Sequence, residues 1–210
     1  QRLCECGETI RWDAVADLAP LRRLNCPACG REHLFSLFEK MDVALTEDCN
    51  LKCQMCRRQE DAASLGKEEI LGVFEEARAI GMQVVSFCGG EPFMHPDVLE
   101  MVEAAVALGL KVQLTTNGTL VTAARIERLR GLDCMTVSID APGALHDKIR
   151  GLPGTYVKAC KALGLAADAG ITRGTNTVIQ RDNAEHLWAL FEDLLEQTDG
   201  RLNYVRHAPV

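Results

Sequence analysis

From residue 42 onward, short apolar runs alternate with longer stretches in which apolar residues recur at helical spacing. The runs are rich in Val, Ile, Leu or Thr, and such short, nearly continuous runs are typical of strands buried in a parallel sheet. They predict strands at Asp42–Leu45, Val84–Phe87, Val112–Thr115, Met135–Ile139, Thr175–Ile179 and Leu202–Val205.

The stretches between the runs carry apolar stripes with a period of three to four residues, which predicts helices packed on the sheet. Gly81, Gly109, Gly131 and Gly170 follow four of these stretches, as expected where a helix ends and the chain reverses. The predicted helices are Ile70–Ile80, one opened by Pro96, Thr122–Arg130, Thr155–Ala169, and a last one capped by Asn183 with Leu187, Leu190, Phe191, Leu194 and Leu195 on its apolar face.

Repeated strand–helix units with right-handed crossovers build a parallel sheet that either curls into a barrel or stays open. Six strand candidates are two short of the eight in a complete barrel. The α/β pattern therefore predicts a partial (β/α)6 TIM-like barrel over residues 39–210. Because no helix follows the sixth strand, we expect this core to be truncated at its C-terminus.

The first 38 residues contain two close cysteine pairs, Cys4 with Cys6 and Cys26 with Cys29, about twenty residues apart. A glycine after each pair permits the tight turn that brings two thiols onto one ion. This spacing favours a zinc-ribbon or rubredoxin-like module with four ligands, too small to fold without its metal. Two disulfides or a second iron–sulfur centre are the alternatives.

Composition narrows the class of protein. The 210 residues are 47% hydrophobic and 25% charged, with a net charge of −7 and a pI near 5.3, which argues against binding to nucleic acid or an anionic membrane. No apolar run approaches the roughly 20 residues that span a bilayer. Ten cysteines in clustered, metal-type spacings favour a reducing compartment, so we expect a cytoplasmic metalloprotein.

Three further cysteines, Cys49, Cys53 and Cys56, directly follow the first predicted strand. Their spacing lets three thiolates converge on one metal centre. Three ligands are one short of the four that usually hold an iron–sulfur cube or close a structural zinc site. The open position predicts a catalytic metal centre. The alternative is a structural zinc site that borrows its fourth ligand.

Three more polar loops follow the next three strands. They are Cys88-Gly89-Gly90-Glu91-Pro92, Thr115–Thr119 with Asn117 in it, and Ser138–Pro142. Ligand sites of parallel α/β sheets lie at the carboxyl ends of the strands. The four loops are therefore expected to form one site, in which the glycines let the backbone approach a ligand closely and Glu91 supplies an anion to pair with an ammonium group.

The chain from about Met41 onward resembles radical S-adenosylmethionine (radical SAM) enzymes. The resemblance rests on CxxxCxxC at Cys49–Cys56 and GGEP at Gly89–Pro92, with Thr116-Asn117-Gly118 in support. The run from Ser138 through His146-Asp147 to Arg150-Gly151 resembles the subgroup of peptide maturases and the enzyme that begins molybdopterin synthesis. An aromatic residue usually precedes the third cysteine, where this chain has Met55.

The resemblance implies a cofactor set and its ligands. Cys49, Cys53 and Cys56 would hold three irons of a 4Fe-4S cluster, and S-adenosylmethionine would chelate the fourth. Gly89, Gly90 and Pro92 would belong to the loop that binds its methionine part, and Glu91 would take its ammonium. Asn117, Ser138 and Arg150 would contact the carboxylate or ribose, with Val178 and residues 205–209 lining the adenine pocket. One electron would then cleave the sulfonium and release a 5′-deoxyadenosyl radical that abstracts hydrogen from the substrate.

The resemblance also implies partners, namely a peptide or small-molecule substrate and an electron donor such as flavodoxin or ferredoxin. Arg57 and Arg58, next to the cysteine loop, are candidates for contact with either. The competing hypothesis for the whole chain is a non-catalytic zinc or iron–sulfur module that senses redox state.

The remaining reactive side chains have ordinary expected roles. Cys88, Cys134 and Cys160 are expected to be small buried residues, and Asp140 either supports the site or forms a turn. The five histidines show no paired metal spacing, so we expect most of them at the surface or at caps, with His207 a candidate on the substrate side.

Overall fold

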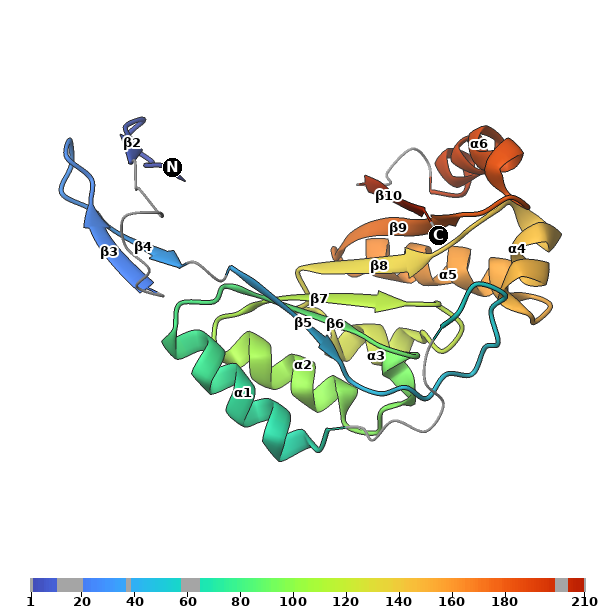
Figure 1. The fold of residues 1–210 in the computed structure, drawn as a ribbon, viewed down its shortest axis with the longest axis horizontal. Coiled ribbons are helices and arrows are strands. Elements are labelled where there is room, and N and C mark those ends of the chain that lie inside the picture. Colours follow the sequence, from blue (N-terminus) through green and yellow to red (C-terminus); the bar gives the residue numbers. More distant parts are fainter. Residues whose placement is uncertain (1, 11–20, 37–38, 58–64, 199–203, 210) are drawn as a thin grey trace.

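The computed structural model describes residues 2–10, 21–36, 39–57, 65–198 and 204–209, and for residues 2, 21–23, 34–36 and 204–209 it describes the backbone alone. Within these ranges the chain forms one six-stranded parallel sheet and two small antiparallel pairs (Figure 1).

The parallel sheet follows the chain order without exception. Its strands are β5 (Lys40–Ala44), β6 (Val84–Cys88), β7 (Lys111–Thr116), β8 (Cys134–Ser138), β9 (Thr172–Ile179) and β10 (Tyr204–Pro209). Each strand pairs only with its neighbours in sequence, and all five pairings are parallel. The partial (β/α)6 barrel predicted from the hydrophobic pattern is confirmed.

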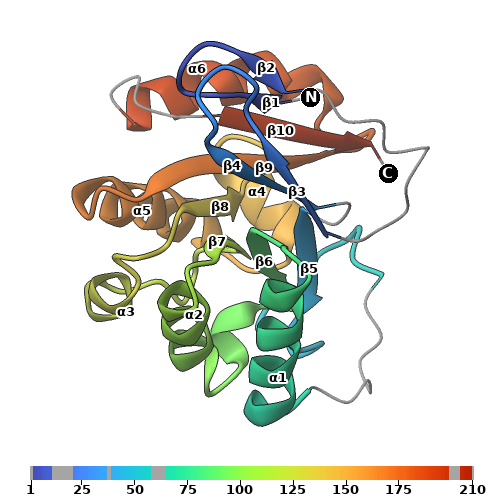
Figure 2. The ribbon, with the colours of Figure 1, turned by 90° about the vertical axis from the view of Figure 1, so that its left-hand side faces the viewer.

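Helices cover the convex face of the sheet (Figure 2). Five lie where apolar stripes predict them, namely α1 (Lys67–Ala79), α2 (Val98–Ala107), α3 (Ala123–Arg128), α5 (Thr155–Asp168) and α6 (Leu187–Gln197). Two 3₁₀ turns, η1 (Pro92–Met94) and η2 (Ala184–His186), precede α2 and α6. A sixth helix, α4 (Gly143–Arg150), was not predicted, because eight residues are too few to show a clear helical period.

The core lies between the sheet and these helices. Phe87 of β6 meets Phe74 of α1 with ring centroids 5.7 Å apart, and both are fully buried. The alternate strand residues point to the concave face, where Thr115, Ser138 and Asn176 line a cavity. The convex side therefore holds the fold together, and the concave side is left for binding.

Two expectations about the last helix are wrong. The Asn183 side chain makes no cap bond to α6. Its oxygen accepts a hydrogen bond from the Gln180 N–H at 2.7 Å, and its nitrogen donates to the carbonyls of Asp140 and Val178, both at 2.8 Å. Phe191 is 40% exposed and stacks against Trp188 instead of the core, since the buried stripe of α6 is narrower than its apolar residues suggest.

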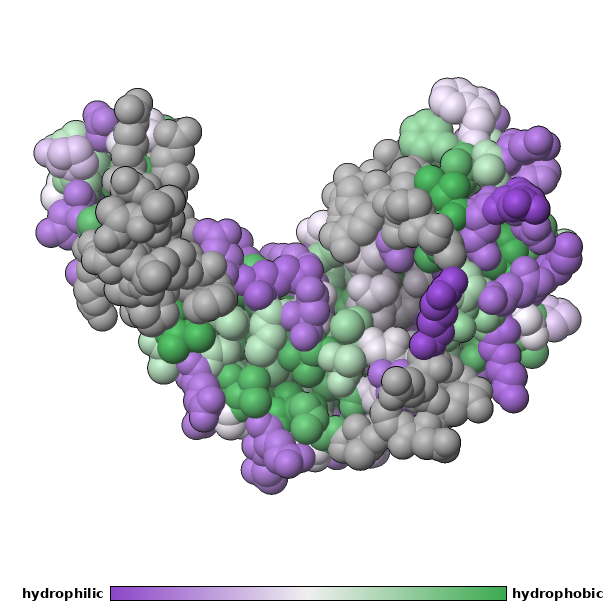
Figure 3. All heavy atoms as spheres, in the orientation of Figure 1, coloured by the Kyte–Doolittle hydropathy of each residue, from purple (hydrophilic) through white to green (hydrophobic). Residues whose placement is uncertain are grey.

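The N-terminal residues form two hairpin-like pairs, β1 (Arg2–Leu3) with β2 (Thr9–Ile10) and β3 (Leu21–Asn25) with β4 (Glu32–Ser36). They project as an arm from one end of the molecule (Figure 3). Because β5 starts just after this arm and β7 and β8 run away from it, the arm lies at the amino ends of the strands (Figure 1). None of the helices in the described ranges has the length and apolar character needed to cross a membrane.

Candidate active site

The polar loops after β5, β6, β7 and β8 meet at one cavity of about 200 Å³ at the carboxyl end of the sheet. The wall contains nine residues for which the resemblance implies a cluster or cofactor role: Cys49, Cys53, Cys56, Gly89, Gly90, Asn117, Ser138, Arg150 and Val178. Leu51, Met55, Cys88, Thr115, Thr116 and Asn176 complete it.

The three cysteines of the loop after β5 are spread along this wall. Only Cys4, Cys6, Cys26 and Cys29, among the described His, Cys, Asp and Glu residues, form a group whose ligand atoms all lie within 4.8 Å of one another. A single tetrahedral zinc holds its thiolates about 3.8 Å apart, given Zn–S bonds of about 2.3 Å. Cys49, Cys53 and Cys56 do not form such a group, but all three line one cavity, where three thiolates leave a coordination position open.

The Gly89–Gly90 loop packs directly on the segment that leads to these cysteines. The Gly90 N–H donates to the Thr46 carbonyl at 2.6 Å, and the Glu91 N–H donates to the Asp48 carbonyl at 2.8 Å. A Cβ on Gly90 would lie 2.2 Å from the Asp48 oxygen, and one on Gly89 would lie 2.5 Å from the Thr46 oxygen. With these N–H groups engaged, the loop can offer a ligand its carbonyl oxygens, which suit an ammonium group.

Glu91 is completely buried and lies outside the cavity wall. Its carboxylate accepts hydrogen bonds from the Thr116 hydroxyl and the Asn117 N–H, both at 2.7 Å, and from the Phe93 N–H at 3.3 Å. Burial raises the pKa of this carboxyl, and the three donors oppose that rise. The carboxylate faces the loop after β7, so at this site it joins two loops. Pro92 is likewise buried off the wall, at the start of η1.

Asn117 is held by its own loop and by the cysteine loop. Its side-chain oxygen accepts from the Thr119 N–H at 2.9 Å and the Thr119 hydroxyl at 2.6 Å. Its nitrogen donates to the Asn50 side-chain oxygen at 2.9 Å and lies 4.0 Å from the Cys49 sulfur. The amide is thus fixed on the cavity wall next to Cys49.

Arg150 reaches the same wall from the end of α4. Its Nε donates to the Asp140 carboxylate at 2.7 Å, and its Nη1 lies 3.8 Å from the Cys53 sulfur. Burial raises the pKa of the Cys53 thiol, while the Arg150 charge opposes this shift. Asp140, left open between two roles by the sequence, supports the site.

Among the described side chains, two histidines are buried, whereas most of the five were expected at the surface or at caps. His146 is 1% exposed, and its Nδ1 accepts a hydrogen bond from the Asp140 N–H at 3.1 Å. Burial lowers its pKa to about 3. His95 is also buried, with its Nε2 3.3 Å from the Leu65 carbonyl oxygen. Neither histidine is a surface residue: His146 lies within α4, and His95 holds the C-cap position of η1.

Asn176 is a wall residue that went unrecognised, and Cys88 lies on the wall although it was expected to be a small buried residue. Asn176 alternates with Val178 on β9, so the assignment of Val178 to the cavity already implied that Asn176 shares its face. Cys88 borders the Gly-Gly loop and lies on the wall, with its thiol 3.6 Å from the Val43 carbonyl oxygen. The side chains of residues 205–209, predicted near the adenine pocket, and Arg58 lie outside the described parts.

The N-terminal cysteines form a second, separate site. The Cys4 and Cys29 sulfurs lie 3.6 Å apart, and those of Cys6 and Cys26 lie 3.5 Å apart. In sequence, Cys4 and Cys6 are followed by Gly7, and Cys26 and Cys29 are followed by Gly30. Both glycines have positive φ, and each donates its N–H to the carbonyl of the first cysteine of its pair, Cys4 or Cys26, at 2.9 Å. The four thiols match a closed four-ligand metal site. His33, which the sequence did not flag, places Nε2 3.3 Å from the Cys4 sulfur.

A partial parallel barrel with three cysteines, a glycine-rich loop and a buried arginine on one cavity defines a class of enzymes that hold an iron–sulfur cluster at the carboxyl edge of the sheet. Residues 43–194 match the family model of the radical SAM superfamily. The chain belongs to this superfamily.

Its relatives act on different substrates. The chain is 32% identical over 155 residues to an AdoMet-dependent heme synthase of Oleidesulfovibrio alaskensis, covering 70% of this chain and 40% of the relative. It is 33% identical over 165 residues to a PqqA peptide cyclase of Gluconobacter oxydans, covering 75% of this chain and 46% of the relative. The chain thus spans less than half of either protein.

Among solved structures, Streptococcus suis SuiB bound to the precursor peptide SuiA superposes with a TM-score of 0.70 at 20% identity. The match covers 82% of this chain and 39% of SuiB. At this identity the match shows a common fold. The resemblance to peptide-modifying enzymes agrees with these comparisons, whereas the similarity to heme synthases was not foreseen.

Proposed function

We propose that the complete protein cleaves S-adenosylmethionine reductively at the cavity after β5 to β8 and uses the product to abstract hydrogen from a substrate. The observation that carries the proposal is the convergence of Cys49, Cys53 and Cys56 with the Gly89–Gly90 loop on one wall. A metal-sensing module needs no such loop.

The donor set fits the cofactors that the family uses. Cys49, Cys53 and Cys56 would hold three irons of a 4Fe-4S cluster and leave the fourth for S-adenosylmethionine. With the cluster and S-adenosylmethionine both bound, the cluster would supply the one electron that cleaves the sulfonium C–S bond. The Gly89 and Gly90 carbonyls would bind the ammonium, and Asn117, Ser138 and Arg150 would contact the carboxylate or ribose.

The chain's own contribution is position and exclusion of water. The Asn117 amide is fixed by Thr119 and Asn50, so it can meet a ligand without further ordering. Leu51 is buried on the wall beside Met55, and both present apolar surface to the cavity. Such a lining would shield a reactive radical from water.

For the substrate we propose a peptide. The support is the relation to a PqqA peptide cyclase and the shared fold with a peptide-bound SuiB. An acidic flavodoxin or ferredoxin would deliver the electron from the side of Arg57, which is exposed next to the cysteine loop. The clustered cysteines and the need for a low-potential electron donor suit a reducing cytoplasm.

The test uses protein reconstituted anaerobically with iron and sulfide. With dithionite and S-adenosylmethionine, the wild-type chain should release 5′-deoxyadenosine, and Cys53→Ala should abolish both the release and most of the iron bound at the cavity. Cys160→Ala, on the partly buried side of α5, is the matched control and should behave as wild type. A wild-type chain that binds four irons there and never cleaves S-adenosylmethionine would refute the proposal.

For the N-terminal site we propose a structural zinc, because four thiolates leave no coordination position open for chemistry. A variant with Cys49, Cys53 and Cys56 all changed to Ala removes the cluster and keeps this site. It should retain one zinc per chain by elemental analysis, with no visible absorbance. One iron per chain with a red colour would identify a rubredoxin-type centre instead.

A further inference from the structure

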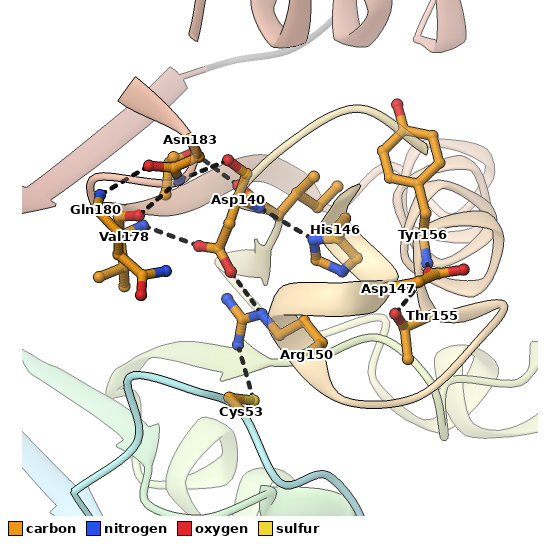
Figure 4. Close-up of polar contacts among 12 residues, drawn as sticks. Cys53, Asp140, His146, Asp147, Arg150, Thr155, Tyr156, Val178, Gln180 and Asn183 are labelled. Atoms are coloured by element: carbon orange, nitrogen blue, oxygen red, sulfur yellow. Dashed lines mark hydrogen bonds and ion pairs between the residues drawn. The ribbon is translucent and has the colours of Figure 1, made fainter. Parts of the chain in front are cut away.

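Arg150 is a buried cation that lies between a carboxylate and a cluster cysteine (Figure 4). Its side chain is 10% exposed, and that of Asp140 is fully buried. Nε bonds the Asp140 carboxylate at 2.7 Å, and the guanidinium continues to the Cys53 sulfur with Nη1 3.8 Å away. The Arg150 guanidinium is thus paired with the Asp140 carboxylate on the side away from the cysteine loop.

Hydrogen bonds hold the N–H, the carbonyl and both carboxylate oxygens of Asp140. Its second carboxylate oxygen accepts from the Val178 N–H at 2.9 Å. Its own N–H donates to His146 Nδ1 at 3.1 Å, and its carbonyl accepts from the Asn183 amide at 2.8 Å. Because Asp140 cannot turn without breaking these bonds, it holds the Arg150 guanidinium in one orientation.

The cysteine loop is docked on the same helix end, on both sides of the contact. The Gln54 N–H donates to the Ile149 carbonyl at 3.0 Å. At Gly151, which closes α4 at a φ of 76°, an added Cβ would lie 2.7 Å from the Lys52 carbonyl oxygen. These backbone contacts hold Cys53 next to the end of α4, where the Arg150 side chain reaches its sulfur.

Asn117 offers a comparison within the same wall. Its amide lies 4.0 Å from the Cys49 sulfur and carries no net charge. Arg150 is closer to its sulfur and is charged. Hydrogen bonds to cluster sulfurs and nearby fixed charges are among the main determinants of reduction potential.

We propose that Arg150, positioned by Asp140, raises the reduction potential of the cluster by donating an N–H to the Cys53 thiolate. Reduction adds one negative charge to the cluster, and a fixed cation with an N–H directed at a ligand sulfur stabilises the reduced form more than the oxidised one. This inference rests on the proposed function, since it requires a cluster on Cys49, Cys53 and Cys56. It gives Arg150 a role that is separate from binding S-adenosylmethionine.

The test is an EPR-monitored redox titration of the anaerobically reconstituted chain without S-adenosylmethionine, so that cofactor binding cannot contribute. Arg150→Gln should shift the midpoint potential to more negative values. Arg150→Lys should shift it less, because lysine keeps the charge but cannot span Asp140 and Cys53 together. Arg128→Gln, which breaks the exposed pair with Glu103, is the matched control and should leave the potential unchanged.

Removing Arg150 alone leaves a buried carboxylate unpaired, which can prevent folding. A second comparison, Asp140→Asn against Asp140→Asn with Arg150→Gln, avoids that charge, and the double variant should have the more negative potential. Full cluster content with an unchanged potential in either comparison would overturn the inference. A wild-type chain that takes up no cluster would instead overturn the proposed function, so the two failures are distinguishable.

Discussion

Gly90 is the position where the glycine-rich loop touches the cysteine loop most closely, and Gly90→Ala tests that contact. A Cβ built there lies 2.2 Å from the Asp48 carbonyl oxygen and 2.7 Å from the Glu47 carbonyl oxygen. Real Cβ contacts do not fall below 3.0 Å, and both atoms belong to the backbone, so the two loops must move apart.

The movement would break the Gly90 N–H bond to Thr46 and the Glu91 N–H bond to Asp48, of 2.6 and 2.8 Å. A net value of about 1 kcal/mol for each bond, plus the strain of the shift, gives a loss of roughly 2 to 4 kcal/mol in the free energy of unfolding. For a chain of this size, the melting temperature would fall by about 5 to 15 °C.

The assay is thermal unfolding followed by circular dichroism, together with iron content after reconstitution. Iron should fall as well, because the displaced segment leads directly into Cys49. Gly72→Ala is the matched control. It lies inside α1 with nothing within 4 Å of the added Cβ, and it should stabilise the chain by about 1 kcal/mol. Unchanged melting and full iron in Gly90→Ala would refute this reasoning.

Three other outcomes are expected. Burial lowers the pKa of His146 from its usual 6.5 to about 3. The buried neutral imidazole therefore contributes fully to the free energy of unfolding above pH 6.5, and this contribution declines as the pH falls toward 3, by about 2 kcal/mol at pH 5. Urea unfolding at pH 7 and pH 5 should show this decline in the wild type and less of it in His146→Asn, which keeps an acceptor for the Asp140 N–H; equal declines would contradict the burial effect. Thr122→Ala should cost about 1 kcal/mol in urea unfolding by removing the α3 cap, where the hydroxyl accepts from the Arg125 N–H at 3.3 Å, and Thr122→Ser should restore it. Cys26→Ser should lower the zinc content without reducing 5′-deoxyadenosine release, and loss of that activity would show that the arm is more than structural.

The sequence by itself determined the order of the six parallel strands, five of the six described helices and the location of both cysteine sites. Buried parallel strands leave short continuous apolar runs and helices leave an apolar period of 3.6, and both patterns can be read from a single chain. The short spacing of Cys49, Cys53 and Cys56 likewise limits them to one loop. Because parallel strands place their carboxyl ends at one edge, even the meeting of the four loops followed from the order of elements.

Only the tertiary structure decided what the individual polar side chains do. Glu91 reads as a free anion in sequence, whereas in the fold its carboxylate accepts hydrogen bonds from the Thr116 hydroxyl and the Asn117 N–H. Arg150 and Cys53 are 97 residues apart, and nothing local to either predicts their contact. Such partners depend on how α4 packs against the cysteine loop, and a short helix with a weak period gives no sign of that packing.

The paired glycines show both sides of this division. Their presence in the sequence predicted that the backbone could approach a ligand closely. In the structure, the backbone of residues 46–48 lies against them. A glycine in the sequence indicates that a neighbouring group can come close, but which group does so depends on the tertiary packing.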